Sequence, residues 1–158
     1  MAVSSTHTGW KYDPDNSRLD FYYRGTRVGH INASQMTLAA GDLALAAGTL
    51  DVQDGGTVTQ ASNKSTGVTL STNSGQITMN GAALGDDTEI SFVVTNTNVA
   101  ATDVVIVNHG SAGTNGAYVV QASEIGSGTF EVSVKNVSGG SLSEAIVINF
   151  VVIKGASS

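Results

Sequence analysis

Three histidines are the side chains of this sequence best suited to bind a metal or to transfer a proton. His7 lies in a tail rich in Ser and Thr, His30 ends a run of alternating residues, and His109 lies in a glycine-rich loop. No two of them have the spacing of a metal-ligand pair, and the HExxH motif is absent. We therefore interpret all three as surface or loop histidines, and the sequence predicts no metal site.

Acidic and hydroxyl side chains also lack a catalytic arrangement. The stretch DPDNS at residues 13–17 begins like a calcium-binding loop, but Arg18 and Arg24 stand where such a loop needs Gly and Glu. The stretch GDD at 85–87 fits a turn before a strand, with a bound cation as the less favoured alternative. Neither the GxSxG motif of a serine nucleophile nor the GK[ST] of a phosphate-binding loop is present. We expect no catalytic residue, no cofactor and no enzymatic activity.

Aromatic residues are concentrated near the start of the chain. Five of the nine aromatic side chains lie between residues 10 and 23, and two arginines follow closely. Because Tyr, Trp and Arg are enriched in protein interfaces, this stretch predicts a binding arm. Two alternatives are that Phe21 and Tyr23 pack on the rest of the chain, or that the stretch binds single-stranded nucleic acid, which three nearby aspartates disfavour. The candidate binding residues are Trp10, Tyr12, Phe21, Tyr22, Tyr23, Arg24 and Arg27.

A seven-residue phrase occurs twice in succession, as TLAAGDL and ALAAGTL at residues 37–50. A helix would align its leucines, but each of its two glycines would cost about 1 kcal/mol. A β-repeat would turn at Gly41 and Gly48, and we favour this interpretation. Because two short units cannot bury their leucines alone, we expect contacts between copies of the chain; the alternative is that the leucines pack on their own β-domain. The expected oligomer contacts are Leu38, Leu43, Leu45 and Leu50.

Charge and composition exclude several classes of protein. The formal net charge is −6, with +1 on residues 1–31 and −7 on the remainder, which argues against a general nucleic-acid binder. Without cysteine there is neither a disulfide framework nor a thiolate metal site. The N-terminus lacks the apolar segment of a signal peptide, and the longest apolar run, at 145–153, is too short to span a bilayer as a helix. We expect a soluble protein made in a cytoplasm.

The sequence predicts strands throughout. The composition is typical of short strands and tight turns, with 19 glycines and one proline. The stretch DPDN predicts a turn, and residues 19–31 predict a hairpin that turns near Gly25. The alternation in FEVSVK puts Phe130, Val132 and Val134 on one face. The almost continuously apolar runs DVVIV and IVINFVVI predict two strands that are covered on both faces.

Strand spacing predicts the fold class and the domain organisation. Eight strands in about 100 residues predict an all-β, jelly-roll-like two-sheet sandwich. We expect an N-terminal arm and hairpin for anchoring (1–35), the LAAG repeat segment for oligomerisation (36–55) and a β-sandwich head (56–158). The expected head strands are 57–61, 66–70, 75–79, 88–95, 103–108, 117–122, 129–136 and 145–153.

Several stretches resemble structural proteins encoded by tailed bacteriophages and prophages. They are WKYDPDNSRLDFYYRGTRVGHINA, the LAAG repeat, GGTVTQASNKSTGVTLSTNSGQITMNGAAL and EAIVINFVVIKG. Such proteins include trimeric capsid cement or decoration proteins with jelly-roll heads, and head or tail fibre proteins. The resemblance implies a virion component without enzymatic activity.

On this resemblance we expect a homotrimeric capsid cement protein whose arm binds the major capsid protein of the same phage and stabilises the shell. It would lie on the capsid exterior after assembly in the host cytoplasm, with neither nucleic acid nor membrane as a partner. Two alternatives stay open: a fibre or tail-associated protein whose head binds a host glycan, and a free carbohydrate-binding module. For a glycan site, Tyr118 is the head aromatic of interest.

Overall fold

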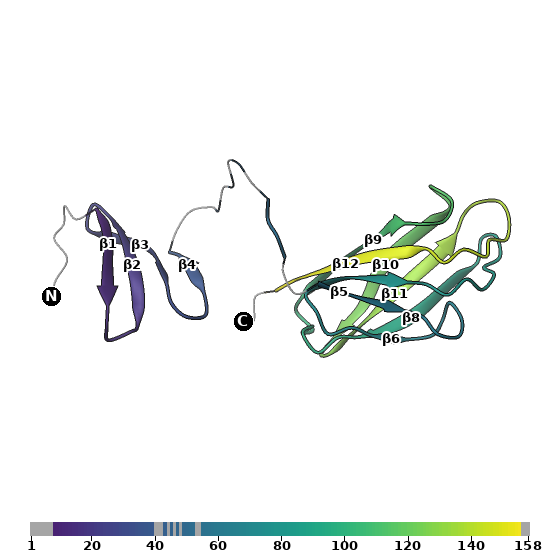
Figure 1. The fold of residues 1–158 in the computed structure, drawn as a ribbon, viewed down its shortest axis with the longest axis horizontal. Coiled ribbons are helices and arrows are strands. Elements are labelled where there is room, and N and C mark those ends of the chain that lie inside the picture. The colour runs from purple at the N-terminus through teal and green to yellow at the C-terminus, as the bar shows by residue number, and fades with distance from the viewer. Residues whose placement is uncertain are drawn as a thin grey trace. The chain divides into compact units, whose positions relative to one another are not determined.

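The computed structural model describes residues 8–39, 43, 45, 47, 49–52 and 55–155. Strands make up the regular secondary structure of these ranges, so the all-β class expected from the sequence is confirmed (Figure 1). In this described part of the chain no helix is long and apolar enough to cross a membrane. The chain divides into two compact units, Met1–Leu50 and Asp51–Ser158.

The N-terminal unit contains one antiparallel sheet in the order β1-β2-β3-β4 (Figure 1). In the DPDN turn between β1 and β2, Asn16 donates its backbone and side-chain N–H groups to the Asp13 carboxylate. Between β2 and β3 the chain turns at Arg24 and Gly25, both with positive φ, a combination typical of tight hairpin turns. The expected hairpin is confirmed, and one further strand extends it on each side. The strands are β1 (Gly9–Asp13), β2 (Arg18–Tyr23), β3 (Thr26–Ile31) and β4 (Met36–Leu38).

The second unit, called the head below, is a sandwich of two four-stranded sheets, β5-β7-β12-β9 and β10-β11-β8-β6 (Figure 1). The edge strands β5 and β6 pair in parallel with β7 and β8, and the other pairs are antiparallel. The expected strands lie within a few residues of their predicted places, so the jelly-roll-like two-sheet sandwich is confirmed. The strands are β5 (Gly55–Thr59), β6 (Val68–Thr69), β7 (Ser74–Thr78), β8 (Glu89–Thr95), β9 (Val104–Ser111), β10 (Tyr118–Gly126), β11 (Thr129–Asn136) and β12 (Val147–Ile153).

The hydrophobic core of the head lies between its two sheets. Phe130, Val132 and Val134 on β11 are buried in it, so the inward face predicted from the alternation in FEVSVK is confirmed. From the facing sheet, Ile148 and Phe150 on β12 are buried against them. The ring centroids of Phe130 and Phe150 lie 5.6 Å apart, which joins the two layers at the centre of the sandwich.

The expectation that β9 and β12 are covered on both faces is wrong. Val105 and Val152 are buried, whereas Val104, Ile106 and Ile153 are each at least half exposed. Each sheet of the head has a second layer on its inner side alone, so apolar residues at alternate positions face outward. A run of apolar residues does not distinguish these two faces, because the run carries no alternation.

The LAAG repeat begins inside the N-terminal sheet. Its first residues form β4, which pairs with β3, and farther along Leu43, Leu45 and Leu50 lie outside regular structure and are exposed. The turns expected at Gly41 and Gly48 lie outside the described residues. The chain thus has two compact units where the sequence predicted three regions, because β4 joins the start of the repeat to the first unit.

Candidate functional site

The N-terminal sheet has one apolar face. Residues that pair directly across neighbouring strands direct their side chains to the same face of a sheet. The register forms one row of four apolar residues, Tyr12–Leu19–Ile31–Met36, and a second row with one glycine, Trp10–Phe21–Gly29–Leu38. Strand alternation adds Tyr23, two residues beyond Phe21. The apolar face consists of Trp10, Tyr12, Leu19, Phe21, Tyr23, Ile31, Met36 and Leu38.

Much of the apolar face is exposed. The exposed fraction is 69% for Trp10, 61% for Tyr12 and 60% for Met36. The Trp10 and Phe21 rings contact each other with centroids 5.8 Å apart, which leaves Phe21 half-buried. In soluble proteins generally, contiguous exposed apolar surfaces are typical of interaction sites, whereas isolated exposed apolar residues are not.

The opposite face of the sheet, called the charged face below, carries an ion-pair cluster around Asp20. Asp20 is buried, and its Oδ1 accepts a hydrogen bond from Arg18 Nε at 2.9 Å and lies 3.6 Å from Arg27 Nη1. Tyr22 Oη donates to Asp20 Oδ2 at 3.4 Å, and Arg18 Nη2 lies 3.2 Å from Asp13 Oδ2. These contacts join β2 to β3 and to the end of β1, so Arg18 and Arg27 hold the sheet together.

In the acidic turn between β1 and β2, the Asp13 carboxylate is bound by Asn16 and Arg18. The pKa of Asp13 is lowered, chiefly because the Asn16 side chain donates a hydrogen bond to its carboxylate, with a smaller contribution from the charge of Arg18. Within the described ranges no group of three or more His, Asp or Glu side chains could hold a metal ion. The calcium-like start of DPDNS is therefore a turn in this structure.

The two described histidines lie in different units, His30 in the N-terminal sheet and His109 in the head. His30 pairs in register with Asp20 on the charged face, and its ring is half-buried. On β9, His109 Nε2 lies 2.6 Å from the carbonyl oxygen of Ala112. His7 lies outside the described residues.

The structure divides the candidate binding residues between the two faces. Tyr22 and Arg27 lie on the charged face, and Arg24 lies at the β2–β3 turn with its guanidinium 5.6 Å from the centroid of the Tyr23 ring. The others share the apolar face with one of the expected oligomer contacts: Trp10, Tyr12, Phe21, Tyr23 and Leu38. Aromatic and leucine residues that the sequence assigned to two functions thus form one surface.

Three members of the apolar face were missed by sequence reasoning: Leu19, Ile31 and Met36. A signal for the first two was present, because the hairpin turn near Gly25 places Leu19 opposite Ile31 once a one-residue bulge is allowed. For Met36 the signal was weak, since β4 has only three residues and begins inside the segment assigned to the repeat.

Tyr118, the aromatic considered for a glycan site, is buried in the head. Its Oη donates to Glu144 Oε2 at 2.9 Å, and its ring packs edge-on against His109 with centroids 5.7 Å apart. Burial, together with the hydrogen bond to Glu144, raises the pKa of Tyr118 to about 12. Because the Tyr118 ring is buried, it is not exposed for a sugar to stack on.

Comparison with protein-family models, with curated protein sequences and with solved structures finds no match to this chain.

Proposed function

We propose that this chain is a structural protein of a virion and that it attaches to another protein of the particle through the apolar face of its N-terminal sheet. A sheet with one apolar face needs a second layer to bury that face. The described residues of the N-terminal unit supply one layer, and the apolar face carries eight large apolar side chains on one side of it. This one-sided sheet is the observation that carries the proposal, with the partner as the second layer.

The partner we propose is the major capsid protein of the same phage. The stretches that resemble phage structural proteins support this choice, and they include β2, β3 and all of β1 except Gly9. In this function the N-terminal sheet anchors the chain to the capsid and the head lies on the outside of the shell. The protein then acts as a cement that strengthens the shell without a catalytic step.

The binding energy would come from burial of apolar surface. The apolar face contains no charged side chain. Arg18 and Arg27 are engaged with Asp20 on the charged face, and Arg24 lies beside the Tyr23 ring at the β2–β3 turn. Large exposed aromatics such as Trp10, Tyr12 and Tyr23 are the residue types that dominate interface energies when a partner buries them. We therefore assign them the role of anchors in the capsid contact.

Several copies would act together. Beyond β4 the chain exposes Leu43, Leu45 and Leu50, which supports their proposed role as contacts between copies. A homotrimer joined in this way would present three apolar faces to the shell. Once one face is bound, the others would bind at high effective concentration, so that modest single contacts would give tight attachment.

The test is binding of the full-length chain to purified capsid shells of the phage or prophage that encodes it. For Trp10→Ala we expect the dissociation constant to rise about 30-fold or more, because truncation of a central anchor costs about 2 kcal/mol or more of binding free energy. Val119→Ala, a truncation at an exposed apolar position on the head, is the matched control and should bind like the unmodified chain. Equal binding of Trp10→Ala and the control would contradict the anchoring role.

Copy number separates the cement function from the fibre alternative. Hundreds of copies per particle, counted by quantitative mass spectrometry of purified virions, are expected for a cement protein. A few to tens of copies would favour a fibre or tail component, and absence from virions would reject both.

A further inference from the structure

The outer face of the head sheet β5-β7-β12-β9, called the uncharged face below, carries no charged side chain in its four strands. By register and alternation its residues are Gly, Thr, Ser, Gln, Asn, Val and Ile. The outer face of the other head sheet, in contrast, carries Glu89, Glu131 and Lys135. Depletion of charge is a feature of the cores of protein interfaces. The residues of the uncharged face are Gly55, Thr57, Thr59, Ser74, Gln76, Thr78, Val147, Asn149, Val151, Ile153, Val104, Ile106, Asn108 and Ser111.

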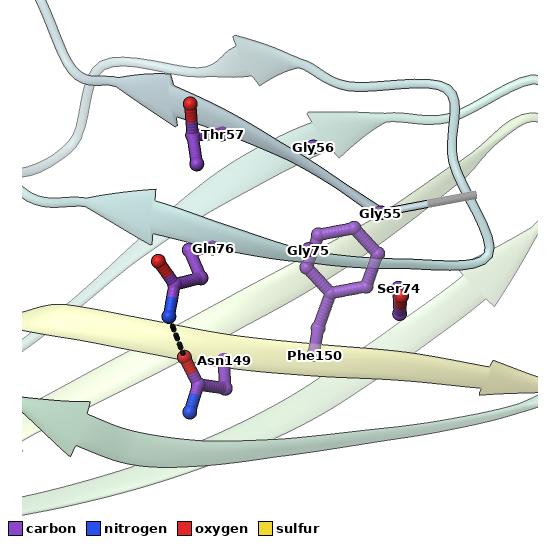
Figure 2. A pocket seen from close by; sticks show the side chains of 8 residues that line it. All are labelled: Gly55, Gly56, Thr57, Ser74, Gly75, Gln76, Asn149 and Phe150. Carbon is purple, nitrogen blue, oxygen red and sulfur yellow. Dashed lines mark hydrogen bonds between the residues drawn. The ribbon is translucent and has the colours of Figure 1, made fainter. Parts of the chain in front are cut away.

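Side-chain size increases along one register row of the uncharged face. One register row runs Gly55–Ser74–Val151–Ile106 from β5 to β9, from no side chain to a large one. At the β5 side there is a shallow hollow of about 510 Å³, in which Gly55, Ser74 and Gly75 form part of the wall (Figure 2). At the β9 side, exposed apolar side chains form a ridge: Val104, Ile106 and Ile153.

The next register row is made of uncharged polar residues, Thr57–Gln76–Asn149–Asn108. Gln76 Nε2 donates to Asn149 Oδ1 at 3.1 Å across β7 and β12 (Figure 2). Amide side chains both donate and accept hydrogen bonds, so such a row can pair with an identical row that faces it.

We propose that the uncharged face packs on the same face of a second copy of this chain, related by a twofold axis parallel to the strands. This rotation places Ile106 of the ridge in each copy above Gly55 at the β5 hollow of the other, and Val151 above Ser74. The surface is then complementary to itself, which a twofold contact requires. The polar rows meet in the same arrangement.

The charge of the head favours a second copy at this face over any other part of the head surface. Residues 51–158 contain nine acidic residues and three lysines, so two heads repel each other at most orientations. The uncharged face is where two such heads approach without bringing carboxylates together. Asp103 and Lys154, which adjoin the ridge in sequence, form an ion pair with each other.

The size of the uncharged face makes this a weak contact by itself. Four strands about 4.8 Å apart, each with about six residues of 3.3 Å, cover roughly 400 Å² per copy. A stable interface buries about 800 Å² per partner, so the contact becomes effective where copies are already held close together. The contact itself does not depend on the proposed function, which supplies only the setting, a shell on which neighbouring heads adjoin.

The experiment uses the absence of native cysteine, so that only introduced thiols react. Full-length Ile106→Cys and Gly55→Cys are mixed at high concentration, which brings copies close together, and are treated with a short bis-maleimide; crosslinked pairs are quantified by mass. A Cβ at Gly55 meets nothing closer than Ser74 Oγ at 3.5 Å, so this substitution is tolerated. We expect at least fivefold more crosslinking than in a mixture of Val93→Cys and Gly55→Cys, since Val93 is similarly exposed but lies on the other sheet.

A charge placed in the uncharged face provides the second arm of the test. Thr57→Glu, added to both cysteine variants, should reduce crosslinking at least fivefold. The new carboxylate would be buried between two heads that each carry a net negative charge. Thr95→Glu, at an exposed position on β8, should leave it unchanged. Crosslinking of Ile106→Cys at the level of the Val93→Cys control would overturn the proposal. The crosslinking experiment needs no capsid. A negative crosslinking result therefore rejects the contact between heads without bearing on whether the chain binds the capsid.

Discussion

Trp10 and Phe21 pair directly across β1 and β2, with their ring centroids 5.8 Å apart on the apolar face. One residue along the same two strands, Lys11 pairs with Asp20 on the charged face. The period of two in a β-strand thus separates the ion pairs that hold the sheet together from the apolar side chains available to a partner. Binding through one face need not disturb the contacts on the other.

Attachment through the apolar face should depend little on salt. Raising the ionic strength from low values to about 0.5 M screens exposed charges strongly but leaves apolar burial almost unchanged. We expect the affinity of the full-length chain for capsid shells to change less than about threefold over this range. Sedimentation of shells with bound chain measures it. A steep loss of affinity with salt would instead assign the contact to the arginines of the sheet.

Asp20→Asn should destabilise the N-terminal sheet. The substitution leaves Arg18 and Arg27 without their shared carboxylate, and a charged group that loses a buried partner costs about 1–3 kcal/mol. Hydrogen exchange of the β2 and β3 amides should become faster, while exchange in β11 of the head stays unchanged. Asp15→Asn, in the exposed turn, is the matched control. Equal protection in the two variants would show that Asp20 does not hold the sheet.

The strand positions of the head could be predicted from the sequence because turn signals and alternation act locally. In FEVSVK the alternation is complete, and Phe130, Val132 and Val134 are buried as expected. In DVVIV every position is apolar, so the sequence could not indicate that Val104 and Ile106 face outward. Which face of a strand is covered depends on the packing of the second sheet, a tertiary property.

The apolar face could be predicted only in part, for a related reason. The aromatic residues of β1 and β2 are conspicuous in the sequence, but their separation from Tyr22 and Arg27 depends on strand register. A shift of one residue would move every side chain to the opposite face. The bulge between β2 and β3, where Phe21 pairs with Gly29 and Tyr22 with Arg27, is the detail that local patterns did not reveal.

Lys64→Met should destabilise the head. Lys64 is 3% exposed, and its Nζ donates to the carbonyl oxygens of Asn80 at 2.7 Å and Glu144 at 2.5 Å. Burial lowers the pKa of Lys64, while the charge of Glu144 acts in the opposite direction. Methionine fills a similar volume but leaves both carbonyls without this donor, which costs about 2–4 kcal/mol.

Thermal unfolding followed by circular dichroism measures the effect of Lys64→Met. Lys135→Met is the matched control, because Lys135 pairs with the exposed Asp87 on the surface and such pairs contribute about 1 kcal/mol or less. A similar decrease in Tm for both variants would mean that the buried hydrogen bonds of Lys64 contribute no more than a surface ion pair.

The stability of the head should decrease in acid through Asp103. The pKa of Asp103 is lowered from 3.8 to about 2, first because Lys154 donates to its carboxylate and then because the backbone N–H of Ala100 does so. A lowered pKa in the folded state means that this stabilisation is present above about pH 4 and is lost as the pH falls towards 2.

Chemical denaturation between pH 5 and pH 2 tests the Asp103 contribution, with Asp103→Asn as the variant. We expect Asp103→Asn to be less stable at pH 5 and its unfolding free energy to fall less steeply towards pH 2. Glu89→Gln, at an exposed position on β8, should follow the unmodified chain. If the slope in Asp103→Asn matches that of the unmodified chain, the acid sensitivity lies elsewhere.

The exposed leucines of the repeat should determine how many copies associate. Leu43, Leu45 and Leu50 are 66%, 51% and 76% exposed, and burying them against other copies would remove this apolar surface from water. Replacing all three with serine in the full-length chain should convert a trimer into single chains, measured by light scattering. The control replaces three exposed valines of the head with serine: Val93, Val119 and Val137. A trimer that survives the leucine substitutions would assign self-association to another surface, and a chain that is monomeric without them would leave the leucines no role in assembly.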